Sequence, residues 1–385
     1  MRTTVRRGVG VIALSLLVLT AACGDDDDDA STGEDGGSAS GSAGEAATAA
    51  EERLAPYLEP ADSIGIEEPL SGEMPEGLKV YWLEGNIQSI LPITQGFEEA
   101  TEDAGWDLTT LTYDPADPQG PGSAMQQAVE GGADYIAVSG QTIDILGPAL
   151  DAAKSAGIPV IDMYSTDEVG GEENGIYANI GGPGYSEASF PVLADYVIND
   201  SGGDAKVLFV NVPDFQILQT VADATLGQFE SECPECDVES LDVTIADLTS
   251  GSVSSQVVSS LQSNPDIEYV FVAIGDLATG LPEALSSGGA ENVKLLGGVP
   301  NPEQLQSLAD GTSVAWIPLP RPMSAWAAVD AMARIELGEE IDQEQHEVLP
   351  IEVKTQDNIE TPVEEYEGPE GYQDQFNQLW GVDGG

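Results

Sequence analysis

Short apolar runs alternate with amphipathic segments from Lys79 to about residue 355. The runs predict strands, at residues 79–83, 108–113, 135–138, 159–163, 206–211, 238–244, 269–273, 293–296, 313–317 and 347–353. Most intervening segments have the apolar spacing of helices, at residues 91–104, 123–130, 143–156, 185–199, 216–232, 252–263, 277–287, 302–308 and 324–337. Continuous apolar strands that alternate with helices are typical of parallel sheets covered on both faces. We therefore predict an α/β fold with doubly wound parallel sheets.

The length of this part predicts two lobes, because roughly 310 residues are more than one hydrophobic core usually fills. Residues 181–184 (GGPG) are a plausible crossover between the lobes. We predict that residues 76–179 and 301–345 form the first lobe and that residues 180–300 and 346–385 form the second. In open sheets of this kind ligands bind beyond the carboxyl ends of the strands, so two facing lobes predict a binding cleft.

The N-terminus is typical of a lipoprotein signal peptide over residues 1–22. Three arginines precede an apolar run at residues 9–19, which is too short for a bilayer span of about 20 residues. Small residues then lead to Cys23, the predicted lipidation site and first residue of the mature chain. A cleaved signal with a chance cysteine and an uncleaved anchor remain alternatives. The pattern predicts an extracytoplasmic protein that is lipid-anchored to the cell membrane.

Residues 23–75 are predicted to be an acidic, flexible tether. Asp25 to Asp29 are followed by a low-complexity stretch of Ser, Gly, Ala and Glu with few large apolar residues. Such a stretch buries too little surface to offset its ordering entropy. A short helix near residues 45–54, ended by Pro56, is the only structure expected there.

The charge balance is extreme, with 11 Lys plus Arg against 69 Asp plus Glu in the whole chain. Removing the three arginines of the signal peptide leaves 8 against 69, a net charge of −61. Such a charge repels phosphate backbones, so no nucleic-acid partner is expected. Adaptation to high external salt (a halophilic source) is favoured over a merely soluble surface, because Lys is nearly absent while the hydrophobic fraction is an ordinary 41%.

Cys233 and Cys236 form a Cys-Pro-Glu-Cys pair between a predicted helix and a predicted strand. A redox motif would open a helix directly after a strand, and a zinc site would need two further ligands. A structural disulfide is therefore the favoured interpretation. The chain also has a single histidine, His346, and no nucleophile-elbow, phosphate-loop or metal-spaced motif. We expect neither an enzyme, nor a cofactor, nor a metal site.

Several phrases resemble the type I periplasmic binding proteins, in the ribose-like branch that feeds ATP-driven (ABC) importers. They are residues 95–100 (QGFEEA), 131–136 (GGADYI), 156–161 (AGIPVI), 275–280 (GDLATG) and 337–339 (LGE). The resemblance covers about residues 76–355. It implies a two-lobed receptor with a three-crossover hinge, in which a late segment completes the first lobe. The implied partners are a small-molecule ligand and an ABC permease. We expect a monomer, and a sensory receptor that signals to a membrane partner is the alternative.

The ligand contacts of the ribose-like branch transfer poorly. This chain has Tyr164-Ser165 where the branch has an Asp-Arg pair, and Gly275 where it has Asn. A Phe-Asp pair of the branch aligns with Gly298-Val299. These departures put a ribose-like ligand in doubt, although a sugar remains the favoured class.

Ligand-binding residues are expected just past the predicted strand ends, where amide and carboxylate groups can pair with hydroxyls. The candidates are Glu84, Asn86, Gln88, Ser89, Gln141, Thr142, Tyr164, Asp214, Phe215, Asp276 and Arg321. Asp276 has a second interpretation as a helix cap. Arg321 is expected to pair with a ligand carboxylate or, slightly favoured, with an acidic residue across the seam between the lobes. Trp82 is favoured as core over ligand platform, and Trp316 and Trp326 as packing residues.

Overall fold

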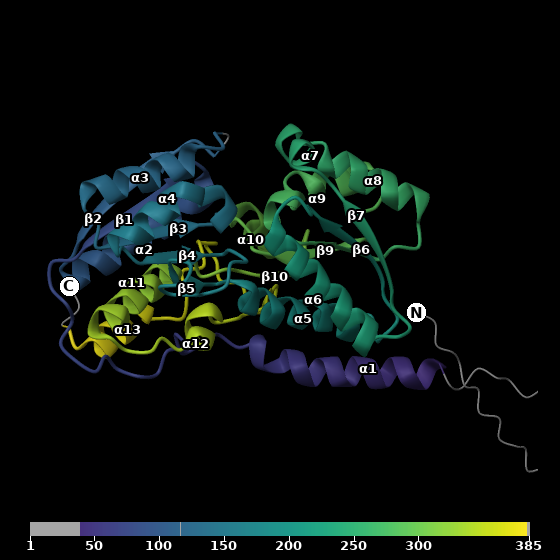
Figure 1. The fold of residues 1–385 in the computed structure, drawn as a ribbon. Coiled ribbons are helices and arrows are strands. Elements are labelled where there is room, and N and C mark those ends of the chain that lie inside the picture. Colours follow the sequence, from purple (N-terminus) through teal and green to yellow (C-terminus); the bar gives the residue numbers. More distant parts are fainter. Residues whose placement is uncertain (1–38, 116, 383–385) are drawn as a thin grey trace, which may run out of the picture. The chain divides into compact units, whose positions relative to one another are not determined.

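The computed structural model describes residues 39–382 apart from residue 116 (Figure 1). The predicted signal peptide, the lipidation site Cys23 and residues 23–38 of the predicted tether lie outside the described residues. Among the residues that are described, no helix is both long and apolar enough to cross a bilayer.

The first sheet has five parallel strands in the order β2-β1-β3-β4-β5. They are β1 (Lys79–Gly85), β2 (Asp107–Tyr113), β3 (Tyr135–Ser139), β4 (Val160–Met163) and β5 (Ile176–Ile180). Helices α3 (Gly120–Gly131) and α4 (Ile143–Ala156) pack together on one face, and α2 (Leu91–Ala104) lies on the other (Figure 1). All four residues of β4 are buried, as expected for a strand that is covered on both faces.

The second sheet has six strands in the order β11-β10-β9-β8-β6-β7. They are β6 (Lys206–Asn211), β7 (Asp237–Asp242), β8 (Tyr269–Val272), β9 (Lys294–Gly298), β10 (Ala315–Ile317) and β11 (Lys354–Thr355). All pair in parallel except β11, which is antiparallel to β10. The helices along this part are α5 (Pro183–Asp200), α6 (Gln216–Glu232), α7 (Ile245–Ser250), α8 (Val253–Ser263), the 3₁₀ helix η3 (Gly275–Ala278), α9 (Leu281–Ser287) and α10 (Pro302–Ala309).

A late helix, α11 (Arg321–Leu337), belongs to the first lobe, where it packs against α2, β4 and β5. This late segment thus packs on the elements of the first sheet. The predicted crossover at residues 181–184 is also found, because β5 lies in the first sheet and the following α5 packs against β9 and β10 of the second. The predicted α/β fold with two parallel-sheet lobes is confirmed.

Two predicted lobe boundaries differ from the structure. β10, within the 301–345 segment assigned to the first lobe, pairs with β9 in the second sheet. Helix α13 (Tyr372–Trp380), within the 346–385 segment assigned to the second lobe, packs against α11 of the first. The indole rings of Trp326 and Trp380 stack there with their centroids 5.3 Å apart. The predicted strand at 347–353 is absent, since α12 (Gln343–Glu347) and an irregular segment precede β11.

The predicted flexible tether is wrong from Ala39 onward. Helix α1 (Ala39–Leu54) packs along α5, and Ala50 and Leu54 are buried (Figure 1). The 3₁₀ helix η1 (Ala55–Tyr57) follows, so α1 ends just before Pro56 as predicted. Alanine is the best helix former and its small side chain permits close helix packing, which explains why a low-complexity composition did not produce a flexible spacer here.

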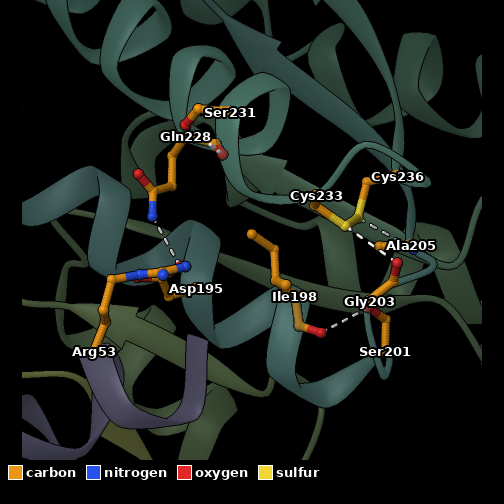
Figure 2. Close-up of a disulfide and its surroundings, with 10 residues drawn as sticks. All are labelled: Arg53, Asp195, Ile198, Ser201, Gly203, Ala205, Gln228, Ser231, Cys233 and Cys236. Carbon is orange, nitrogen blue, oxygen red and sulfur yellow. Dashed lines mark hydrogen bonds and ion pairs between the residues drawn. A yellow bond between two sulfur atoms is a disulfide. The ribbon is translucent and has the colours of Figure 1, made fainter. Parts of the chain in front are cut away.

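A charged contact holds α1 on α5. The Nε and NH2 groups of Arg53 donate to the Asp195 carboxylate at 2.8 and 2.7 Å, and Gln228 of α6 donates to the same carboxylate at 2.9 Å (Figure 2). Asp195 is buried, and a two-pronged arginine contact is the geometry that best pairs a carboxylate. Farther along, Ile64 and Ile66 are also buried, so the ordered extension continues beyond α1.

Cys233 and Cys236 form the predicted disulfide at the turn between α6 and β7 (Figure 2). The backbone amide of Cys236 also donates to the carbonyl of Cys233 at 2.9 Å, which closes the same turn. The favoured interpretation of this pair as a structural disulfide is confirmed.

Gly96 of α2 marks the closest approach of α2 to α11. A Cβ atom at this position would overlap the backbone carbonyl of Pro322. Gly96→Ala should therefore lower the free energy of unfolding by about 1–3 kcal/mol, which chemical denaturation would measure. Gly227→Ala in α6 is the matched control: its Cβ meets nothing within 4 Å, so the change should stabilise the protein by about 0.5–1 kcal/mol. Equal shifts in both variants would contradict the close approach.

Candidate functional site

A cavity of about 200 Å³ lies beyond the carboxyl ends of strands from both sheets. Its lining follows β1, β4 and β5 in the first sheet and β8, β9 and β10 in the second, with the start of α5, α6 and α11. The lining residues are Ser89, Ile90, Ile93, Tyr164, Gly181, Tyr185, Ser186, Phe190, Ile217, Leu218, Val221, Ala273, Ile274, Asp276, Val299, Asn301, Leu319 and Arg321. This is the position at which parallel sheets bind ligands.

Four of the predicted site residues line this cavity: Ser89, Tyr164, Asp276 and Arg321. They come from four separate parts of the chain, which meet at this cavity. Whether they contact a ligand remains a prediction.

The other predicted residues do not line the cavity. The Glu84 carboxylate accepts hydrogen bonds from Thr94 at 2.6 Å and Thr112 at 3.1 Å. Asp214 accepts a bond from the Ile245 amide at 3.2 Å. The remaining members of this group are Asn86, Gln141, Thr142 and Phe215, and the side chain of Gln88 is outside the described part of the structure. Local hydrogen bonds thus engage Glu84 and Asp214, two of the three carboxylates that the strand-end rule had selected for the ligand.

Arg321, at the start of α11, is paired inside the protein. Its Nε donates to the Glu365 carboxylate at 3.0 Å and its NH2 donates to the Pro300 carbonyl at 2.9 Å, and only 4% of the residue is exposed. Burial raises the pKa of Glu365, and the Arg321 charge opposes that rise. The structural pairing, the favoured of the two interpretations, is the one found. The Arg321 charge is therefore neutralised before any ligand arrives.

Asp276 lies in η3 at the edge of the cavity and is exposed. One of its carboxylate oxygens accepts a hydrogen bond from the Asn301 amide at 2.9 Å. The N-cap residue of this 3₁₀ helix is Ile274, and Asp276 lies in its first turn, so Asp276 is not the residue that caps η3. With Arg321 already paired to Glu365, Asp276 gives the cavity edge a negative charge.

Two residues of the lining have strained backbones. Tyr164, directly after β4, has φ 57°, and Val299, directly after β9, has φ 47°. A positive φ is rare outside glycine, and for a β-branched residue such as valine it is a true outlier. These are the only non-glycine residues of the described chain with positive φ, and both line the cavity. Strained residues of this kind concentrate at binding sites, which supports a functional role for this cavity.

The tryptophans are packing residues, as predicted. Trp82 is fully buried, its Nε1 donates to Thr94 at 2.8 Å, and its ring lies 4.9 Å from the ring of Phe97. Trp316 and Trp326 are buried as well and none of the three lines the cavity.

Sequence reasoning missed the apolar part of the lining. Phe190 of α5 and Ile217, Leu218 and Val221 of α6 face the cavity, together with Ile93 of α2. A search for polar residues at strand ends cannot find them, because apolar residues in the first turns of helices look like ordinary core positions. Their position directly after a loop that follows a strand end could have identified them as lining residues.

The comparisons with known proteins agree with this architecture. Residues 83–340 match the family model described as a periplasmic binding protein domain. None of the curated proteins with which the sequence was compared is similar to it.

Several solved structures are similar in fold. A solute-binding protein from Actinobacillus succinogenes with bound D-allose is 18% identical, with TM-score 0.63, covering 73% of this chain and 98% of its own. A periplasmic ribose transporter protein from Conexibacter woesei is 20% identical, with TM-score 0.64, covering 75% and 95%. An ABC transporter solute-binding protein from Mycobacterium smegmatis with bound glycerol is 17% identical, with TM-score 0.64. The match covers 76% of this chain and 99% of that protein. At these identities the likeness concerns the fold. Since the family model spans more than half of the chain, this protein belongs to the periplasmic binding protein family.

Proposed function

We propose that this chain captures a small solute between its two lobes outside the cytoplasm and delivers it to the permease of an ABC importer. The observation that carries the proposal is the cavity at the carboxyl ends of both sheets, which is lined by residues of both lobes. A solute that contacts both lobes at once favours the arrangement in which they close around it.

The size of the cavity and the family relationship support a ring-sized solute. A sugar is the class that the sequence favours, and D-allose is bound in one of the structures with the same fold. The chain acts as a binding protein without catalysis in this proposal, and as a monomer that is attached to the cell membrane through a lipid on Cys23.

Solute capture can be tested by titrating the mature chain with D-allose, D-ribose, D-glucose, benzyl alcohol and benzylamine. A bound solute should raise the melting temperature, because it stabilises the folded state by mass action. Asp276→Ala should weaken binding of that solute. Asp214→Ala is the matched control, since this aspartate also follows a strand end but does not line the cavity, and it should leave affinity unchanged. Equal losses in both variants would show that the binding site is elsewhere.

The lipid anchor has a separate test. Mass spectrometry of the protein purified from its own membranes should find diacylglycerol and acyl modification on Cys23 as the first residue. An unmodified Cys23 on an intracellular product would contradict extracytoplasmic capture.

A further inference from the structure

The lining of the cavity is mostly apolar. The α6 residues Ile217, Leu218 and Val221 face it together with Phe190, Ile90 and Ile93. Phe190, Ile93, Leu218 and Val221 are buried, with at most 5% of each residue exposed. A ligand in contact with these side chains is stabilised in proportion to the apolar surface that it brings.

The lining residues with polar side chains are Ser89, Tyr164, Tyr185, Ser186, Asp276, Asn301 and Arg321. Several of them are already engaged within the protein, and the Tyr185 hydroxyl donates to the Pro318 carbonyl at 3.1 Å. Arg321 is bonded to Glu365 and to a backbone carbonyl, and the Asn301 amide donates to Asp276. A free hexose presents hydroxyl groups around its whole ring, and each one buried without a partner weakens binding. The groups that remain, among them Ser89, Tyr164 and Ser186, are fewer than the hydroxyl groups of such a ring need, and the lining better matches a ring with an apolar surface and one polar end.

The carboxyl edges of the two sheets also carry apolar side chains. Among the described residues, the large apolar side chains that are exposed are Ile87, Leu91, Ile145, Phe215 and Ile245. Each follows the carboxyl end of a strand by a few residues. Ile87 and Leu91 follow β1, Ile145 follows β3, Phe215 follows β6 and Ile245 follows β7. These are the edges at which the cavity lies, so closure of the lobes over a solute would remove apolar surface from water at the rim as well.

Building on the solute capture proposed above, we propose that the ligand is a single-ring, largely apolar molecule with one hydrogen-bond-donating end, preferably an amine, and not a free hexose or pentose. The volume of about 200 Å³ is below the range of about 300–1,000 Å³ of sites for drug-sized ligands, which limits the ligand to about one ring. The donor end faces Asp276, whose carboxylate is exposed at the edge of the cavity.

Calorimetric titration with matched probes tests the ligand class. Benzylamine and benzyl alcohol should bind at least about tenfold more tightly than D-allose, D-ribose or D-glucose, because an apolar pocket discriminates by tens-fold on small apolar differences. Benzylamine should also bind more tightly than benzoate. The binding of benzylamine and of benzyl alcohol should have a negative heat-capacity change, because it buries apolar surface. If a sugar binds and the aromatic probes do not, the inference is wrong and solute capture stands. Binding by none of the probes at millimolar concentration would also overturn the inference.

Substitutions test whether the probes bind in this cavity. Ile217→Asn places an amide in the lining and should weaken benzyl alcohol binding by about tenfold. Asp223→Asn is the matched control: it places the same amide on α6 at an exposed residue that does not line the cavity, and affinity should not change. Asp276→Asn should reduce the preference for benzylamine over benzoate. An unchanged preference would contradict the assignment of Asp276 as the partner of the donor end.

Discussion

Asp330→Ala should lower the free energy of unfolding by about 3–5 kcal/mol, measured by chemical denaturation at neutral pH. Asp330 of α11 is fully buried and accepts hydrogen bonds from three side chains. The donors are Arg334 Nε at 2.7 Å, His346 Nε2 at 2.8 Å and Trp380 Nε1 at 2.9 Å. This carboxylate therefore connects α11, α12 and α13. Its removal leaves two buried ring nitrogens without their partner. It also takes one carboxylate from the buried Arg334 guanidinium, which keeps Glu339 and the Glu68 carbonyl. Losing these buried contacts costs far more than the loss of a surface contact.

An exposed aspartate provides the control for this prediction. Asp266 pairs with Lys206 at 3.4 Å, and 82% of its side chain is exposed. Asp266→Ala should change stability by less than about 1 kcal/mol, as is usual for surface ion pairs. Comparable losses in the two variants would contradict the view that Asp330 organises the late helices.

The same carboxylate has a predictable effect at acid pH. Burial would raise the pKa of Asp330, but the hydrogen bonds and charges of His346 and Arg334 outweigh burial and hold the pKa below its usual value. A lowered folded-state pKa contributes stability that is present above the unfolded-state value of about 3.9 and is lost as the pH falls below it. Loss of this contribution is part of the acid unfolding expected of the protein.

Asp162→Asn should make the protein more stable at pH 9 and flatten its dependence on pH between about 4 and 8. Asp162 of β4 is fully buried, and burial raises its pKa to about 8, although bonds from Ser165 at 2.5 Å and the Met163 amide at 2.9 Å oppose the rise. Between pH 4 and 8 the folded state holds a proton that the unfolded state has released, so wild-type stability falls as the pH rises through this range. Asparagine has the same shape and no charge to bury.

Each unit of pKa difference corresponds to about 1.4 kcal/mol, so the Asp162→Asn gain at pH 9 can reach a few kcal/mol. Denaturation curves of both proteins from pH 4 to 9 would measure it. Asp151→Asn, which removes a charge from the exposed side of α4, should give a curve parallel to that of the wild type. If the curves of wild type and Asp162→Asn are parallel as well, the carboxylate is not protonated in the folded state.

The sequence predicted regular elements best where periodicity and end signals agree. Helices α2, α4 and α6 have the bounds that their apolar spacing predicted. Gly105 and Gly157 end α2 and α4 in the left-handed conformation, which is the usual stop signal for a helix. β5 (Ile176–Ile180) was missed because it follows a polar loop and is interrupted by the polar residue Asn179. The position of α13 was also missed, because its stacking of Trp380 on Trp326 links segments that are far apart in the sequence.

The candidate site was predicted in position but not in composition. The strand-end rule placed Tyr164, Asp276 and Arg321 at one cavity, which they do line. It could not show that Arg321 is paired with Glu365, more than forty residues away, or that Thr94 and Thr112 engage Glu84. Pairings of this kind depend on the tertiary structure, and they decide which polar groups are left for a ligand.

Closure of the two lobes around a solute can be measured directly as a distance between them. A spin label at Ile145→Cys in the first lobe and another at Ile245→Cys in the second would report the distance between the carboxyl edges of the two sheets, since both residues are exposed there. The distance should shorten when benzylamine, or whichever solute of the panel raises the melting temperature most, reaches saturation. An unchanged distance distribution at saturation would contradict capture by lobe closure.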